Sequence, residues 1–192
     1  FMGFAVDGAK RMEQLILDLL RLAKVDANPK IEKVKLNNVT EEIKLNLEVL
    51  IKERNAKITY SNLPELMVDK TMMSQLFQNI VSNGIKYNEN EQPSIHIQHW
   101  MKKNILELSI TDNGIGIPKE LREKAFQIFQ RLPTAKKYSG SGIGLAICKK
   151  IVESFNGKIF IDDNPAGGSM FRMEFPLSIL GTADAVSQMP AA

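Results

Sequence analysis

Three short stretches combine polar side chains with glycines in patterns that could bind a flat, charged ligand. In the first, Asp112 follows the alternating run Ile105–Ile110, so a carboxylate leaves a predicted strand and enters a turn that contains Gly114 and Gly116. Glycines let a backbone approach a ligand where a Cβ would collide. A buried carboxylate needs a hydrogen-bond donor, which a heterocyclic amino group could supply. Taken alone, Asp-Asn-Gly is equally typical of an ordinary turn.

The second stretch is a row of polar side chains on a predicted helix over residues 70–87. Asn79 and Asn83 are four residues apart, and Lys86 or Tyr87 follows three or four residues later, so these side chains stack on one face. Asparagine is a poor residue for a helix interior, because its side chain competes for backbone hydrogen bonds. The row is therefore either a solvent face or a stripe that faces a ligand.

The third stretch is a turn that contains Gly140, Gly142 and Gly144 and that leads into a predicted helix over residues 143–155. The free N–H groups and the dipole at the start of a helix favour an anion. The glycine spacing does not match the dinucleotide-binding fingerprint, and no predicted strand immediately precedes the turn. The turn alone is therefore a weak indication of a phosphate site.

A mixed framework of helices and strands must position these stretches. Besides the two helices above, the periodicity predicts one helix over residues 4–26, one that Asn38 or Thr40 caps and that runs to about residue 54, and one that Pro118 opens. Asp69 is the expected cap of the helix over residues 70–87. Strands are expected at residues 33–36, 57–60, 94–101, 105–110, 158–161 and 170–175. Residues 132–139 lose periodicity and are expected to be mobile.

The first predicted helix carries a heptad seam of apolar residues. Ala5, Met12 and Leu19 recur every seven residues, and Leu15 and Leu22 follow three residues after the last two. Burying these side chains does not offset the conformational entropy of ordering a single helix, so the helix needs a partner. We expect that partner to be a second copy of the chain or a segment upstream of it.

Composition excludes several classes of protein. The net charge of +3, without a run of five basic residues, does not point to nucleic acid. Cys148 stands alone in a helical pattern and is expected to be a buried, inert thiol. His96 and His99 have no further ligand nearby, which favours a strand surface over a metal site. No apolar stretch reaches membrane-spanning length and the start is unlike a signal peptide, so a cytoplasmic location is expected.

In this order, the motifs resemble those of the ATP-binding domain of sensor histidine kinases, within the wider group that includes DNA gyrase, the Hsp90 chaperones and MutL. The matching segments are the N box at residues 79–87, the first glycine box at 112–118, the F box at 126–131 and the second glycine box at 140–145. The resemblance covers residues 34–177. Residues 4–20 resemble the second helix of the dimerisation and phosphoacceptor hairpin, and the similarity is closest to the bacteriophytochrome-like kinases.

The resemblance implies an α/β (α+β) two-layer sandwich, the Bergerat fold. A mixed, largely antiparallel sheet of about five strands would pack on three helices, preceded by one long coiled-coil-like helix. The implied domains are residues 1–28 as part of the hairpin and residues 29–178 as the ATP-binding catalytic domain. Residues 179–192 are small and aperiodic, and we expect a disordered tail there.

The resemblance also assigns roles for ATP and Mg²⁺. Asp112 would accept a hydrogen bond from the adenine amino group, and Asn83, with Asn79 nearby, would hold Mg²⁺ through amide oxygens. Asn83, Lys86 and Arg131 would act in catalysis, with Arg131 reaching the γ-phosphate, and residues 132–139 would form the ATP lid. The full set of expected nucleotide contacts is Asn79, Asn83, Lys86, Tyr87, Asp112, Gly114, Gly116, Ile117, Phe129, Arg131, Gly140, Ser141, Gly142, Ile143, Gly144 and Leu145.

One position separates kinase from hydrolase within the wider group. The relatives that hydrolyse ATP carry a glutamate one helical turn before the magnesium asparagine, whereas this chain has Asn79, which cannot take a proton. The implied function is therefore transfer of the γ-phosphate to a histidine that this sequence lacks, and then to an aspartate of a response regulator. In that family the histidine lies on the first hairpin helix, and the full-length protein is expected to be a homodimer.

Two other functions compete with this interpretation. One is a regulatory nucleotide-binding module that never transfers phosphate. The other is a partner-switching serine kinase, as in anti-sigma factors, against which the heptad helix argues.

Overall fold

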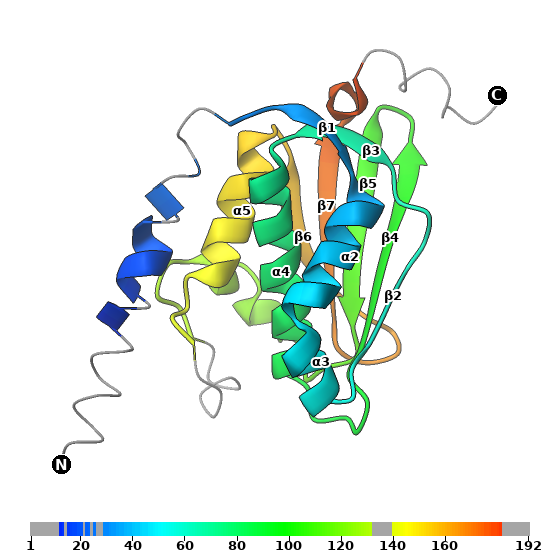
Figure 1. Cartoon of the computed structure of the whole chain (residues 1–192). Coiled ribbons are helices and arrows are strands. Elements are labelled where there is room, and N and C mark those ends of the chain that lie inside the picture. Colours follow the sequence, from blue (N-terminus) through cyan, green and yellow to red (C-terminus); the bar gives the residue numbers. More distant parts are fainter. Residues whose placement is uncertain are drawn as a thin grey trace.

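The computed structural model describes residues 12, 13, 15–20, 22, 23, 25, 29–131 and 140–181. In this part of the chain, a five-stranded sheet carries helices on one face (Figure 1). The strands are β1 (Glu32–Lys35), β2 (Lys57–Tyr60), β3 (Glu65–Val68), β4 (Ser94–Lys102), β5 (Ile105–Asp112), β6 (Lys158–Asp163) and β7 (Ser169–Pro176). The helices are α2 (Leu36–Asn46), α3 (Glu48–Glu53), α4 (Lys70–Lys86) and α5 (Gly144–Ser154), with 3-10 turns at Lys119–Leu121, Lys124–Phe126 and Leu177–Leu180.

The main sheet has the strand order β2-β4-β5-β7-β6, and β1 pairs with β3 in a separate two-stranded sheet. Strands β2 and β4 run parallel, whereas the other neighbours in the main sheet are antiparallel. Ile97 pairs with Ile110, which in turn pairs with Phe171, and all three side chains are buried under the helices. The prediction of a mixed, largely antiparallel five-stranded sheet packed on helices is confirmed.

Helix α4 is the central helix of the covering layer and packs against both α2 and α5. Its apolar side chains Met73, Leu76 and Phe77 are fully buried, as the helical period predicts. Asp69 caps the helix, because its Oδ1 accepts a hydrogen bond from the Met72 N–H at 3.0 Å. The polar row that contains Asn79 therefore lies beside the buried stripe, at the side of α4 that adjoins α5.

The described helical residues before β1 are 12, 13, 15–20, 22 and 23, and we call them the N-terminal helix. Some of their apolar side chains pack against the rest of the chain and others are exposed. Leu22 and Val25 are buried in the hydrophobic core, and Leu15 packs against it. Met12, Ile16, Leu17, Leu19 and Leu20 are exposed. The rest of the chain therefore covers Leu15 and Leu22 of the predicted seam and leaves Met12 and Leu19 exposed, and the pairing of the seam with another helix stays a prediction. Ala5 lies outside the described residues.

Several predicted elements differ from the structure. The helix expected to start at Asn38 or Thr40 starts at Leu36, and Thr40 lies inside it, with its hydroxyl donating to the Leu36 carbonyl at 2.9 Å. This helix is also interrupted at Leu47, where α2 gives way to α3. The predicted helix after Pro118 is wrong, because that segment forms two 3-10 turns. Strand β3 was not predicted.

The packed part of the domain continues beyond residue 178. Ile179 and Leu180 are buried in the last 3-10 turn, so these two residues of the predicted tail are ordered. Residues 182–192 of that tail and the predicted lid, residues 132–139, lie outside the described residues. Among the described helices, none combines the length and the apolar character that crossing a bilayer requires.

Candidate functional site

A cavity of ≈ 340 Å³ lies where α4, α5 and the turn after β5 meet. It brings together side chains from all three stretches that the sequence singled out. Its lining residues are Asp18, Gln75, Asn79, Asn83, Gly84, Tyr87, Asp112, Ile115, Gly116, Ile117, Ala125, Gln130, Arg131, Gly140, Ser141, Gly142, Gly144, Leu145, Ile147, Ser169 and Phe171.

Asp112 is the last residue of β5 and is only 8% exposed. Its Oδ1 accepts hydrogen bonds from the Gly114 N–H at 2.8 Å and the Ser169 N–H at 3.2 Å. Neither bond involves Oδ2, so this oxygen can accept a donor from a ligand in the cavity. Burial raises the pKa of the Asp112 carboxyl, and the two N–H groups offset part of this increase. A hydrogen bond from a ligand donor would stabilise such a buried carboxylate, because little water competes for it.

The turn that follows Asp112 has no room for side chains on its glycines. A Cβ on Gly114 would lie 2.5 Å from the carbonyl oxygen of Tyr87 and 3.0 Å from Asp112 Oδ1. The Ile115 N–H donates to the same Tyr87 carbonyl at 3.0 Å, which ties this turn to the end of α4. The absence of a Cβ on Gly114 therefore lets the Asp112 carboxylate and the end of α4 lie close to the backbone of this turn.

Asn79 and Asn83 line the cavity from α4, and both are half-buried. Asn79 Nδ2 donates to the Gly144 carbonyl at 3.2 Å, so its amide nitrogen fixes the start of α5. The amide oxygens of these asparagines are hard, neutral ligands of the type that Mg²⁺ accepts alongside phosphate oxygens and water. The donor set in the cavity thus fits a magnesium–nucleotide complex.

The glycine turn at residues 140–144 closes the other wall of the cavity. Gly142 has a φ of +73°, and a Cβ there would lie 2.9 Å from the Gln130 carbonyl oxygen, so glycine is required on both counts. Helix α5 begins at Gly144 without a side-chain cap. Its first N–H groups are therefore available to an anion in the cavity.

Positive charge gathers beside this turn. Lys86 Nζ lies 3.6 Å from the position of a Cβ on Gly140 and over the Tyr87 ring at 5.4 Å from its centroid. Burial lowers the pKa of Lys86, and the positive charge of Arg131 lowers it further. Because both effects disfavour the charged lysine, an anion at this place would restore its proton affinity.

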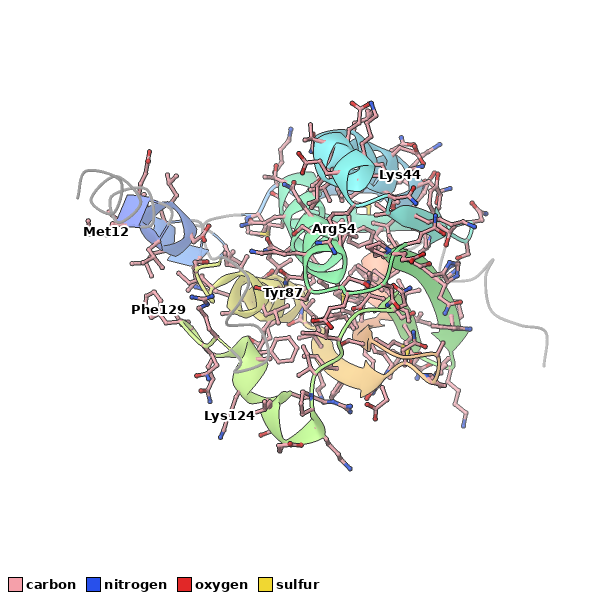
Figure 2. All side chains as sticks on the ribbon, turned by 90° about the horizontal axis from the view of Figure 1, so that it is seen from below. Met12, Lys44, Arg54, Tyr87, Lys124 and Phe129 are labelled. Carbon is pink, nitrogen blue, oxygen red and sulfur yellow. The ribbon has the colours of Figure 1, made fainter. Side chains whose placement is uncertain are left out.

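Twelve of the sixteen expected nucleotide contacts line the cavity, and four do not. Lys86 and Gly114 lie just behind the lining, as described above. Ile143 is fully buried at the start of α5. Phe129 is 59% exposed with a φ of +62°, and Figure 2 shows its ring projecting away from the body of the molecule.

Sequence reasoning missed nine lining residues. Gln75 lies one turn before Asn79 on the same helical stripe, so extending that stripe could have found it. Ser169 and Phe171 come from β7, and only the pairing of β5 with β7 brings them to the cavity. Asp18 comes from the N-terminal helix, and nothing in the sequence indicates that it reaches this site. Gly84, Ile115 and Gln130 lie inside the predicted motifs but were not among the expected contacts, and the remaining two are Ala125 and Ile147.

The two groups outside the cavity behave as expected from the sequence. Cys148 is fully buried, and burial raises the pKa of its thiol to about 12, so it is an inert core residue. His96 and His99 both lie on β4. His96 contacts the Thr59 hydroxyl at 2.9 Å, which places it on a strand surface.

Comparison with known proteins agrees with this geometry. The sequence model of the histidine kinase-, DNA gyrase B- and HSP90-like ATPases matches residues 68–179. The phytochrome-like protein Cph1 of Synechocystis sp. is 39% identical over 178 residues, which are 92% of this chain and 24% of Cph1. The chain therefore spans a minor part of this relative's length.

Two solved structures share the fold. The catalytic domain of histidine kinase ThkA has a TM-score of 0.65 at 27% identity, over 77% of this chain and 97% of that domain. Full-length ShkA in complex with AMPPNP has a TM-score of 0.73 at 20% identity, over 90% of this chain and 37% of ShkA. With the family match covering more than half of its residues, the chain belongs to the histidine kinase-, DNA gyrase B- and HSP90-like ATPases.

Proposed function

We propose that this chain is the ATP-binding catalytic portion of a sensor histidine kinase, which transfers the γ-phosphoryl group of ATP to a histidine on another helix. The observation that supports this most directly is the convergence in one cavity of the Asp112 carboxylate, the Asn79 and Asn83 amides, and the glycine turn at residues 140–144. The similarity to Cph1 and to the ThkA catalytic domain favours a sensor kinase over the other members of the family.

Asp112 would select the base. Its Oδ2 would accept a hydrogen bond from the adenine amino group, and guanine offers no donor at that position. Leaving a buried carboxylate without its donor is costly, so the discrimination against guanine is expected to be strong.

The phosphates would lie between α4 and the glycine turn. Asn83, with Asn79 beside it, would hold Mg²⁺, which would neutralise phosphate charge when bound. The N–H groups of the turn and the side chains of Lys86 and Arg131 would contact phosphate oxygens. Catalysis by these residues would consist of positioning and charge neutralisation.

Transfer is favoured over hydrolysis by the residue at position 79. An amide there cannot take a proton from water, so the bond to the γ-phosphate would persist until an imidazole nitrogen attacks. In that step the nitrogen forms a bond to phosphorus, the bond to the bridging oxygen breaks, and ADP leaves.

The acceptor histidine would come from a helix, whereas His96 and His99 both lie on β4. We propose residues 1–28 as the second helix of a dimerisation and phosphoacceptor hairpin and residues 29–178 as the catalytic domain. In the full-length protein this arrangement would form a homodimer, and a response-regulator aspartate would receive the phosphate. ThkA has been solved in complex with the response regulator protein TrrA.

The test is phosphate transfer to a separate fragment that carries the acceptor helix of the natural kinase. The chain, labelled ATP and Mg²⁺ are mixed with that fragment, and acid-labile label on its histidine is measured. We expect label in this mixture, and none when the acceptor histidine is replaced by glutamine.

Nucleotide binding without label on the histidine would support the regulatory module instead. Label that survives acid treatment would indicate a serine and would favour a serine kinase. Failure to bind ATP at all would contradict the whole proposal.

A further inference from the structure

The two halves of the candidate nucleotide site come from elements that lie far apart in the sequence. Asn83 and Lys86 lie in the last turn of α4, and Asp112 ends β5. Figure 1 shows α4 and β5 ending at the same end of the molecule. A nucleotide that reaches both the Asp112 carboxylate and the polar row on α4 needs a fixed distance between these two element ends. The contacts that fix this distance therefore decide how well the site fits its ligand.

Asn88 follows α4 and uses every hydrogen-bonding group of its side chain. It is only 1% exposed. Its Nδ2 donates to the Gly84 carbonyl at 3.1 Å and to Asn113 Oδ1 at 2.8 Å. Its Oδ1 accepts from the backbone N–H and from Nδ2 of Asn90, at 3.0 and 3.1 Å. The bond to Gly84 satisfies a carbonyl in the last turn of α4, and the bond to Asn113 joins that helix end to the turn after β5.

Asn113 is the other partner in this bridge. Its Oδ1 also accepts from the Ser94 N–H at 2.7 Å, and its Nδ2 donates to the Gln92 carbonyl at 3.2 Å. Because backbone groups bind both ends of this amide, its oxygen is the acceptor and Asn88 is the donor. Since Asn113 directly follows Asp112, the bridge fixes the strand end that carries the carboxylate relative to the end of α4.

Neither Asn88 nor Asn113 lines the nucleotide cavity, so each can affect a ligand only through the groups that it holds in place. Arg54, just after α3, donates from Nη2 to the Asn88 carbonyl at 2.7 Å, which fixes the backbone of Asn88. The backbone bond from the Ile115 N–H to the Tyr87 carbonyl spans the same gap between α4 and the turn. The amide bridge is the side-chain part of this connection, and a substitution can remove it.

We propose that Asn88 and Asn113 are positioning residues for ATP, and that their hydrogen bond sets the distance between the adenine end and the phosphate end of the site. This inference rests on the proposed function, since it needs one nucleotide to contact both Asp112 and Asn83. A ligand that contacts both ends gains from their fixed spacing, whereas a ligand that contacts one end does not. Loss of the bridge therefore weakens the binding of ATP more than that of adenosine, which has no phosphates.

The primary test measures the affinities for ATP with Mg²⁺ and for adenosine by NMR titration, in the whole chain and in the variant Asn113→Ala. This variant removes the bridge but leaves the bond from Asn88 to the Gly84 carbonyl. We expect ATP affinity to fall by about tenfold or more and adenosine affinity to change much less. Equal losses for the two ligands would overturn the inference, because the pair would then hold only the Asp112 carboxylate.

A double-mutant cycle tests whether the two asparagines act as one unit. The double variant Asn88→Ala, Asn113→Ala should lose little more ATP affinity than Asn88→Ala alone, because either substitution already breaks the bridge. Losses that add would contradict the inference, because each asparagine would then act independently.

Asn37→Ala is the matched control. Asn37 Nδ2 donates to Asn62 Oδ1 at 3.1 Å and its Oδ1 accepts from the Leu63 N–H at 2.9 Å, outside the nucleotide cavity. Loss of this second amide bridge should lower the melting temperature and leave both affinities unchanged. The same result in Asn113→Ala would show that the bridge to Asn88 is merely structural and would overturn the inference. Failure of the proposed function would appear differently, as no ATP binding in the unsubstituted chain.

Discussion

The buried Asp112 carboxylate lowers the stability of the ligand-free protein but can accept a hydrogen bond from a ligand. It is a carboxylate at the buried end of a strand, and its two backbone donors satisfy only one of its oxygens. Burial raises the pKa of this carboxyl because the charged form loses water. A buried carboxylate of this kind is expected where a ligand supplies the missing donor. Without the ligand, this carboxylate makes the folded protein less stable than it could be.

Replacing Asp112 by asparagine should therefore separate binding from stability. The amide keeps an acceptor for Gly114 and Ser169 but presents an NH₂ group where adenine needs an acceptor. We expect ATP affinity to fall by about 100-fold or more, measured by calorimetry. The melting temperature of the ligand-free protein should rise at neutral pH, because the buried charge is gone.

The pH dependence follows from the raised pKa. An ionised Asp112 destabilises the folded state, so its cost is absent at low pH and grows as the pH rises from the ordinary carboxyl pKa to the raised one. The melting-temperature gain of Asp112→Asn should grow over that window and persist above it. The exposed Asp163→Asn is the matched control and should leave ATP affinity unchanged. Unaltered ATP affinity in Asp112→Asn would refute the adenine role.

Asn83 offers a test of the metal assignment at the same scale. We expect Asn83→Ala to lose about tenfold in ATP affinity with Mg²⁺ present and to bind ATP almost equally with or without the metal. Titrations in Mg²⁺ and in chelator measure both values. Alanine suits a helix interior better than asparagine, so α4 should remain folded. Gln78→Ala, on the exposed side of α4, should keep the full magnesium dependence.

At the scale of elements, the sequence predicts a helix most accurately where one side of that helix is buried against a single core. The apolar residues of α4 recur at the helical period along its whole length, because a single core covers one side of the helix. Asp69 precedes the helix as a recognisable cap. The segment after Pro118 has apolar residues at Phe126, Ile128 and Phe129, yet only two 3-10 turns form there. Ile128 and Phe129 are exposed, so no buried stripe supports a longer helix.

The candidate site was predictable where its residues come from local motifs, and not where tertiary contact supplies them. Gly142 and Asn83 belong to recognisable stretches of sequence. Ser169 reaches the cavity only through the pairing of β5 with β7, which no local pattern encodes. Strand β3 was missed because its four residues directly follow Pro64 and pair only with β1.

The cap of α4 supplies the prediction at this scale. Asp69 Oδ1 accepts from Met72 N–H and its Oδ2 accepts from Lys30 N–H at 2.8 Å, so one side chain anchors both α4 and the segment before β1. We expect Asp69→Ala to lower the free energy of unfolding by about 1–2 kcal/mol, measured by chemical denaturation. Asp69→Asn should recover part of the loss, since it keeps one acceptor but offers a donor toward Lys30. Equal stability of alanine and wild type would show that the cap contributes nothing.

At the scale of the whole molecule, the N-terminal helix has two kinds of surface. One face, with Leu15 and Leu22, is covered by the hydrophobic core of the rest of the chain. The other exposes Met12, Ile16 and Leu19 to solvent, and Figure 2 shows Met12 on the same flank of the molecule as Phe129. A contiguous apolar face on an exposed helix is typical of an interaction surface. In the proposed kinase, this face would pack against the other helices of the dimerisation bundle.

The isolated chain should therefore associate through this face at high concentration. Ile16 is 60% exposed, and we expect Ile16→Lys to shift the chain toward monomer in sedimentation experiments while ATP affinity stays unchanged. Leu45→Lys is the control for a general gain in solubility, because Leu45 is 72% exposed on α2, remote in sequence from this helix. If both variants dissociate equally, association is not specific to the N-terminal helix. If Ile16→Lys alone dissociates but loses ATP affinity, its exposed face is coupled to the nucleotide cavity, and the two faces of the helix do not act independently.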